Sequence, residues 1–322
     1  MTLHEDSIIF DAHCDTLLAV VNGERKLTDA SIAGNVDVPR LQQGGVTAQV
    51  FAIYIEDQWR WRATVQAMRM IDAFRQAVEI SQGNLRLATC VADIECAKKE
   101  RCVAGILSLE GAEPLDGDLA VLRLFYRLGV RAVGLTWNHR NQAADGVGES
   151  RTGGGLTEFG VALVQEMNRL GMLVDVAHLA PQGVQDVLAL SRAPIIASHA
   201  NAHALCPHPR NLTDEQLKAI AATNGVVGAT FYRGFIAENA AQATSDRLLD
   251  HVDHLVSIMG IDHVGLGSDF DGFGGDPAPE GLEDVARLPN LTAKLQKRGY
   301  QPDDVRKILG GNFLRVFREV AG

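Results

Sequence analysis

The stretch "SIIFDAHCD", residues 7–15, begins with apolar residues and ends with alternating polar ones. The apolar run is typical of a buried strand. Because successive side chains of a strand point to opposite faces, His13 and Asp15 are expected to point in one direction and Cys14 in the other. Asp11 lies one residue pair too deep to reach the end of the strand. We therefore expect a strand whose carboxyl end presents two polar side chains to one place.

Seven similar runs follow along the chain, and helix-like amphipathic segments separate them. The strand-like runs cover residues 46–55, 103–110, 130–137, 172–178, 194–199, 225–231 and 263–269. The helical patterns cover residues 60–80, 115–128, 156–170, 181–190, 213–223 and 245–259. Such alternation predicts βαβ units with parallel strands. Eight strands within about 270 residues match the α/β fold of a (β/α)8 TIM barrel of the metal-dependent hydrolase type.

The alternative architecture is a doubly wound open sheet. No G-x-G-x-x-G motif follows the first strand, so the usual dinucleotide signature of that fold is missing. With 322 residues, 46% of them hydrophobic, the chain can bury one large core. We expect a single barrel domain over residues 1–322, with helices at about 280–320 packing outside it.

Composition excludes several kinds of partner. The net charge is −10, the pI is near 5.5 and no Lys/Arg cluster stands out, so a nucleic-acid surface is not expected. No basic, apolar leader and no run long enough for a membrane span is visible. The five cysteines are odd in number and include no CxxC pair, which favours reduced packing residues. A cytoplasmic protein without a membrane partner is expected.

Residues able to bind a metal stand at the ends of five of the expected strands. They are His13, Asp15, Glu110, His178, His199 and Asp269. A parallel barrel gathers the carboxyl ends of its strands on one face, where the active sites of this fold lie. Imidazole and carboxylate ligands together suit Zn²⁺ or a similar divalent ion. The pattern therefore predicts a metal site.

A glycine-rich loop, "DGFGGD" at residues 271–276, follows the last strand and offers a different interpretation. Barrels often bind phosphate in this region. Here Asp269, Asp271 and Asp276 concentrate negative charge in the loop, which would repel an anion. Phosphate binding is therefore the less favoured hypothesis.

Six motifs occur in order along nearly the whole chain: "DAHCDT", "SLEGAEPL", "VAHLAP", "ASHANAHAL", "HPRNLTDEQL" and "VGLGSDFDGF". Together they resemble the membrane (renal) dipeptidase family, the M19 metallopeptidase group of the amidohydrolase superfamily. The resemblance implies two zinc ions per subunit. By this analogy His13, Asp15 and Glu110 bind one ion, Glu110, His178 and His199 bind the other, and Glu110 bridges them.

The resemblance also implies an activity, which is hydrolysis of small dipeptides by attack of a metal-bridging hydroxide. Dipeptides with a C-terminal D-amino acid are included among the expected substrates. Asp269 would be the catalytic acid/base, and Arg210 would bind the substrate's C-terminal carboxylate, a role that suits a guanidinium group. A homodimer is a possible assembly for such a protein.

Two positions depart from the family pattern. Trp137 stands where a substrate-contacting His is expected, and His139 could take that role instead. Phe235 stands where a substrate-binding Tyr is expected, with Tyr232 nearby. These departures keep open a second hypothesis, a metal-dependent amidohydrolase acting on another small amide such as an N-acyl amino acid or a lactam. A non-enzymatic barrel is a third, and it is disfavoured because no metal-binding residue is lost.

Overall fold

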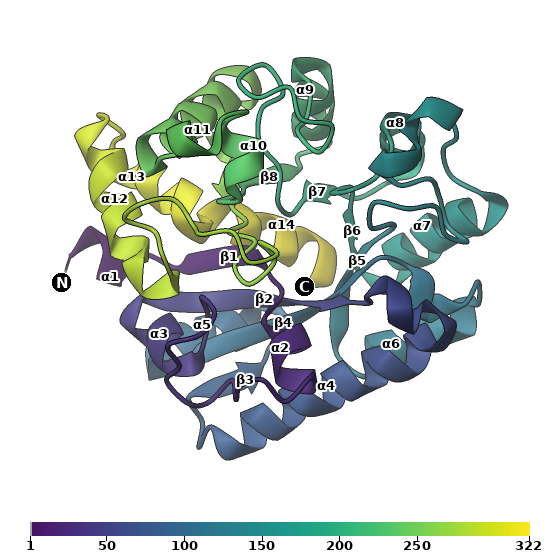
Figure 1. Ribbon diagram of the computed structural model, residues 1–322, viewed down its shortest axis with the longest axis horizontal. Coiled ribbons are helices and arrows are strands. Elements are labelled where there is room, and N and C mark those ends of the chain that lie inside the picture. The colour runs from purple at the N-terminus through teal and green to yellow at the C-terminus, as the bar shows by residue number, and fades with distance from the viewer. Residues whose placement is uncertain (1) are drawn as a thin grey trace.

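The computed structural model describes residues 2–322. Within this part of the chain, eight parallel strands close into a barrel surrounded by helices (Figure 1), which confirms the (β/α)8 prediction. In order around the barrel, the strands are β1 (Ile9–Cys14), β2 (Val46–Tyr54), β4 (Val103–Glu110), β5 (Val130–Gly134), β6 (Leu173–Asp175), β7 (Ile196–Ala197), β8 (Val226–Ala229) and β9 (Val264–Leu266). The pairing of β9 with β1 closes the ring.

A short strand and a helix that the sequence did not predict lie between β2 and β4. Strand β3 (Leu85–Leu87) pairs with the first residues of β4, and helix α5 (Val91–Glu100) follows it. The strand has only three residues, one of them exposed, so no periodic apolar pattern marks it. The result is a ninth strand, paired with the start of β4 ahead of the residues of β4 that pair with β5.

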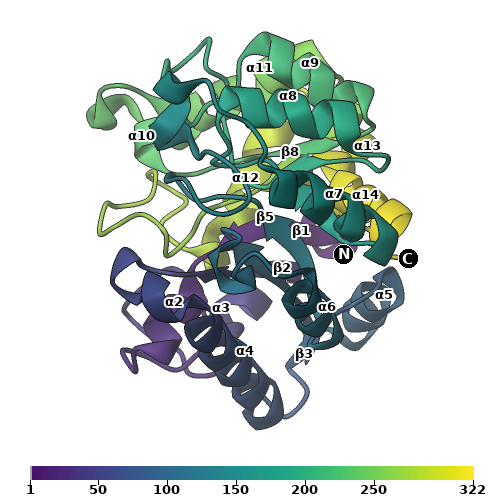
Figure 2. The same ribbon diagram turned by 90° about the vertical axis from the view of Figure 1, so that its right-hand side faces the viewer.

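The helical layer follows the predicted pattern. The other helices are α1 (Leu3–Asp6), α2 (Thr16–Val21), α3 (Val38–Gln43), α4 (Ala63–Ile80), α6 (Leu119–Arg127), α7 (Glu158–Leu170), α8 (Pro181–Leu190), α9 (Asp214–Ala222), α10 (Arg233–Ile236), α11 (Ser245–Met259), α12 (Leu288–Lys297), α13 (Pro302–Arg306) and α14 (Asn312–Ala321). Figure 2 shows α4 and α6 on one side of the barrel and α8, α9 and α11 on the other. In residues 2–322, no helix combines the length and apolar character that a membrane crossing requires.

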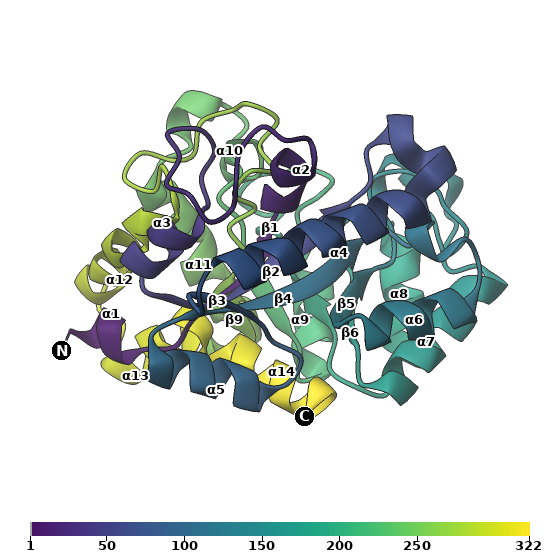
Figure 3. The same ribbon diagram turned by 90° about the horizontal axis from the view of Figure 1, so that it is seen from below.

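The last helix closes the amino-terminal end of the barrel. A buried cluster joins residues near the starts of opposite strands, such as Phe10 of β1 and Leu173 of β6, so this cluster occupies the barrel interior. Phe313 and Phe317 of α14 belong to the same cluster, and the Phe313 ring stacks on Phe10 at 5.5 Å. In Figure 3, α5, α13 and α14 lie at this end, and α2 and α10 lie at the opposite end. The opposite end therefore remains for a functional site.

Strand β1 does not alternate regularly along its length. Asp11 pairs with Gln49 and Cys14 with Phe51, so two residues of β1, Ala12 and His13, oppose the single residue Val50 of β2, which is a β-bulge. Ala12 lies in the interior cluster, whereas Cys14 lies in the cluster between strands and helices. The bulge changes the direction of the side chains immediately before the polar end of the strand.

Candidate metal centre and substrate cavity

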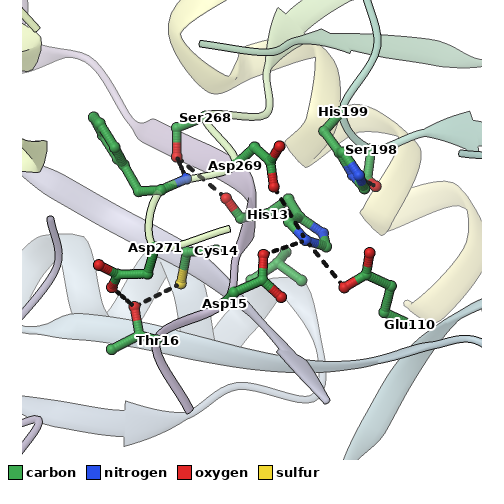
Figure 4. Close-up of polar contacts among 12 residues, drawn as sticks. His13, Cys14, Asp15, Thr16, Glu110, Ser198, His199, Ser268, Asp269 and Asp271 are labelled. Atoms are coloured by element: carbon green, nitrogen blue, oxygen red, sulfur yellow. Dashed lines mark hydrogen bonds and ion pairs between the residues drawn. The ribbon is translucent and has the colours of Figure 1, made fainter. Parts of the chain in front are cut away.

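The six residues at the strand ends come together at the carboxyl end of the barrel, and all six are buried. His13 Nε2 lies 3.2 Å from Asp15 Oδ2 and 3.4 Å from Glu110 Oε2 (Figure 4). His13 Nε2 also lies 3.9 Å from Asp269 Oδ1. On the other side, Glu110 Oε1 lies 3.0 Å from His178 Nε2. Glu110 thus faces a different imidazole with each of its oxygens.

Two of these residues leave the extended conformation after their strands. His178 follows β6 with φ = +67°, and Asp269 follows β9 with φ = +64°. Residues other than glycine adopt this left-handed conformation infrequently, and such residues cluster at functional sites. The turns bring both side chains into the polar cluster, which regular strand continuation would not do. Figure 4 shows Asp269 beside His13 and Cys14 directed away, toward Thr16.

Neighbouring polar groups orient two of the imidazoles. His178 Nδ1 donates a hydrogen bond to Asn138 Oδ1 at 2.8 Å, which leaves its Nε2 free of a proton in the neutral ring. His199 Nδ1 lies 2.8 Å from Ser198 Oγ. Burial, with nearby positive charge, holds the pKa of both rings well below the usual value. Neutral imidazoles held through Nδ1 are the form in which histidine binds metals.

The Nε2 atoms of His178 and His199 face each other at only 2.9 Å. Two further acceptors, Asp15 Oδ1 and Glu110 Oε2, are buried without a hydrogen-bond partner among residues 2–322. Unpaired buried acceptors are costly unless a cation or donor meets them. The cluster therefore fits divalent cations such as Zn²⁺, with nitrogen and carboxylate oxygen as ligands.

Concentrated negative charge governs the electrostatics of the cluster. Burial and the charge of Asp15 raise the pKa of Glu110 to about 7. Burial also raises the pKa of Asp269 well above its usual value, with Asp15 and Glu110 adding to the shift. For His13, burial lowers the pKa, but the carboxylates of Glu110 and Asp15 outweigh burial and the net shift is upward. A site of this potential attracts cations.

A cavity of about 490 Å³ opens over the cluster. Its lining comprises Asp15, Leu18, Tyr54, Glu110, Trp137, Asn138, His178, His199, His208, Arg210, Tyr232, Phe235, Asp269, Asp271, Gly272, Phe273 and Gly274. The dimensions suit a small ligand rather than a long chain.

Arg210 is the buried cation of this cavity. Its Nη2 donates to the backbone oxygen of His199 at 3.2 Å, and the guanidinium lies 5.3 Å from the Phe235 ring centroid. Its Nε has no hydrogen-bond partner among the described residues. Burial lowers the pKa of Arg210 to about 10, so the group stays charged at neutral pH. A charged, incompletely paired guanidinium in a cavity is suited to a carboxylate.

The structure separates the other residues expected to bind substrate. Trp137 and Tyr232 line the cavity. His139 lies outside this lining, with a half-exposed side chain 3.8 Å from Asp57. Sequence reasoning missed Tyr54, although this residue ends its strand directly beside Glu110. The strand was expected to run to residue 55 and a Tyr is not among the preferred zinc ligands, so the metal-ligand pattern did not select it.

Asp271 does not add free negative charge to the loop, contrary to the sequence interpretation. Its carboxylate forms an ion pair with Arg25 and accepts hydrogen bonds from Thr16 Oγ1 and the backbone N of Asn35, both at 2.6 Å. These contacts tie the segment around residues 25–35 to the loop that carries Asp269. The charge of Asp271 is thereby balanced, and the loop is held in place at the rim of the cavity.

Asp11 joins strands β1 and β9 by hydrogen bonds beneath the metal-binding cluster. It accepts hydrogen bonds from Ser268 N at 2.7 Å and Ser268 Oγ at 2.6 Å, and Ser268 Oγ also lies 3.2 Å from the backbone oxygen of His13. Ser268 immediately precedes Asp269. This pair therefore links β1 to β9 at the level of the site.

Replacing Ser268 by Ala is expected to destabilise the protein by about 1–3 kcal/mol, because a buried carboxylate loses a hydrogen-bond donor. Thermal unfolding should show a midpoint lowered by a few degrees. Ser257→Ala removes an exposed hydroxyl that donates to a backbone oxygen and serves as the matched control. Equal midpoints for the two variants would contradict the assigned role of Ser268.

The family model described as membrane dipeptidase (peptidase family M19) matches residues 1–322. The chain belongs to the M19 family. A crystal structure of a Rhodobacter sphaeroides metallo peptidase, liganded with a phosphinate mimic of the dipeptide L-Ala-D-Ala, superposes with a TM-score of 0.91 at 33% identity. The match covers 98% of this chain and 100% of that one.

Two relatives extend the comparison. Dipeptidase tcpJ of Claviceps purpurea (strain 20.1) is 35% identical over 299 residues, 90% of this chain and 70% of the relative. A protein of Klebsiella pneumoniae described as an uncharacterized protein in the pqqA 5' region is 41% identical over 254 residues, 76% of this chain and 93% of the relative. This M19 chain is a metallo-dipeptidase, as the resemblance of its six motifs to that family implied.

Proposed function

We propose that this M19 chain is a zinc dipeptidase that binds two ions and hydrolyses small dipeptides, including those with a C-terminal D-amino acid. His13 and Asp15 would hold one ion, His178 and His199 the other, and Glu110 would bridge both. The observation that carries this proposal is the position of Glu110, whose two oxygens face His13 and His178 at 3.4 and 3.0 Å. When bound, two such ions supply a hydroxide nucleophile at neutral pH and polarise the scissile carbonyl.

Asp269 would carry the proton of the reaction. Burial raises its pKa well above the usual value, which favours uptake of a proton, as a general acid/base requires. In this role one carboxylate oxygen accepts the proton of the attacking water and then delivers it to the leaving amine. The residue lines the cavity beside His13, so substrate can reach it.

Arg210 would select substrates with a free C-terminus. A dipeptide places its carboxylate one residue beyond the scissile bond, and the buried guanidinium can pair with it bidentately. The Rhodobacter sphaeroides structure holds a mimic of L-Ala-D-Ala, and this supports a D-residue at the C-terminal position. Tyr232 and Phe235 stand beside Arg210 around the cavity and would contact that residue.

An N-acyl amino acid is the second candidate substrate. It presents the same carboxylate and the same amide bond, and the aromatic rings of Tyr54 and Trp137 in the cavity lining could contact an acyl group. Dipeptides and N-acyl amino acids differ in the free amino group next to the scissile bond. A comparison of kcat/KM between matched compounds of the two classes separates the alternatives.

Metal analysis and a substrate screen on one preparation test the proposal. We expect two equivalents of zinc per chain, release of amino acids from L-L and L-D dipeptides, loss of activity with a chelator and recovery with added Zn²⁺. Unfolding monitored in parallel shows whether chelation acts on the site or on the whole fold. Zinc-loaded protein that releases no amino acid from a broad dipeptide panel would contradict the proposal.

A further inference from the structure

Three apolar side chains, which we call the aromatic wall, line one part of the cavity: Leu18, Tyr54 and Trp137. The rings of Tyr54 and Trp137 lie 5.1 Å apart at 52°, and the Trp137 ring lies 6.0 Å from that of His178. All three residues are half-buried, unlike the fully buried core around them. The wall therefore offers apolar surface to whatever enters the cavity.

The barrel order places Tyr54 of the wall across the cavity from Arg210 and places Trp137 two strands away from it. Tyr54 ends β2, and Trp137 follows β5. Arg210 follows β7, which lies four strands from β2 in the eight-stranded ring. Glu110 ends β4, the strand between β2 and β5, so it lies on the wall's side of the metal cluster.

A dipeptide bound across this cavity has a defined orientation. Its C-terminal carboxylate pairs with Arg210 in the proposed function, and its scissile amide lies over Glu110 and Asp269. The N-terminal residue then extends away from Arg210. The apolar surface it meets is the aromatic wall, because Leu18, Tyr54 and Trp137 line the same cavity and Tyr54 stands opposite Arg210.

The chemistry of the wall favours apolar partners. Burial raises the pKa of the Tyr54 hydroxyl, so this group is neutral at physiological pH. Trp137 and Leu18 carry no charge. Covering such half-buried rings with an apolar side chain gains about 25 cal/mol for each Å² removed from water. A charged side chain would instead lose hydration against these rings.

We propose that the aromatic wall is the binding subsite for the N-terminal side chain of the substrate, and that the enzyme prefers dipeptides with a large apolar or aromatic N-terminal residue. This inference rests on the proposed dipeptidase function. In this proposal Trp137 recognises the N-terminal side chain of the dipeptide, and Tyr54 and Leu18 also determine which N-terminal residues the enzyme accepts.

The test measures kcat/KM for Phe-Ala, Leu-Ala, Gly-Ala and Glu-Ala with the zinc-loaded enzyme. We expect Phe-Ala and Leu-Ala to exceed Gly-Ala by about 10- to 100-fold, as a hydrophobic pocket allows, and Glu-Ala to be the poorest substrate. In Trp137→Ala the ratio of Phe-Ala to Gly-Ala should fall toward one. Tyr54→Leu should lower the same ratio, whereas Tyr54→Phe should retain it because the ring remains.

Trp61→Ala is the matched control, because Trp61 is 75% exposed and lies outside this cavity. It should leave the ratio unchanged. A wild-type enzyme that cleaves all four dipeptides with equal kcat/KM, or a ratio that survives both Trp137→Ala and Tyr54→Leu, overturns the subsite and leaves the dipeptidase function standing. A zinc-loaded enzyme that cleaves none of the four, and none of their D-Ala counterparts, overturns both.

Discussion

Replacing Asp269 by Asn is expected to lower kcat by about 10³-fold, within the range that general acid–base catalysis contributes, and to leave the zinc content unchanged. The side chain keeps its shape but can no longer take a proton from water and return it to the leaving amine. The buried position and raised pKa of Asp269 support this proposed role. Steady-state kinetics and metal analysis on the same preparation measure the two quantities.

The metal analysis is needed because Asp269 also lies close to the ligand atoms of His13 and Asp15. A variant that loses zinc would identify Asp269 as a metal ligand, and unchanged turnover would remove it from the reaction. Asp303→Asn is the matched control. The side chain of Asp303 is 88% exposed and pairs only with Arg306 among the ion pairs of the described residues, so kcat should not change.

The barrel and the face that carries its site were predictable because the sequence pattern of strands and helices and the geometry of a parallel barrel lead to the same conclusion. Apolar runs alternating with amphipathic segments predict parallel strands, and parallel strands of a barrel bring their carboxyl ends to one face. Any metal-binding residue at such an end must then approach the others. For this reason Glu110 and His199, 89 positions apart in the sequence, could be assigned to one cluster before their contacts were known.

The missed features depend on local geometry that has no periodic signature. The bulge in β1 inserts one residue between Asp11 and Cys14, and strict alternation does not describe that strand. The left-handed turn at His178 is set by tertiary contacts such as the hydrogen bond to Asn138. Likewise, the ion pair of Asp271 with Arg25 joins residues 246 positions apart, and composition alone suggested an unbalanced charge.

Replacing Glu110 by Gln is expected to remove at least one of the two proposed zinc ions and to lower kcat/KM by about 10³-fold or more. Metal polarisation supplies several kcal/mol of transition-state stabilisation, and each 1.36 kcal/mol corresponds to a factor of ten. The substitution keeps the length of the side chain but replaces one carboxylate oxygen with an NH₂ donor. That donor would face the imidazole of either His13 or His178, where a cation is expected to lie.

Two measurements separate a bridging role from a purely structural one. Zinc stoichiometry should fall in Glu110→Gln even when circular dichroism matches that of the wild type, and excess Zn²⁺ should not restore full activity. Glu95→Gln, at a half-exposed residue that pairs with Arg318, should change neither quantity. A Glu110→Gln enzyme that retains two zinc ions and wild-type turnover would contradict the bridging role of Glu110. The ligands of the two ions would then have to be arranged differently from the proposal.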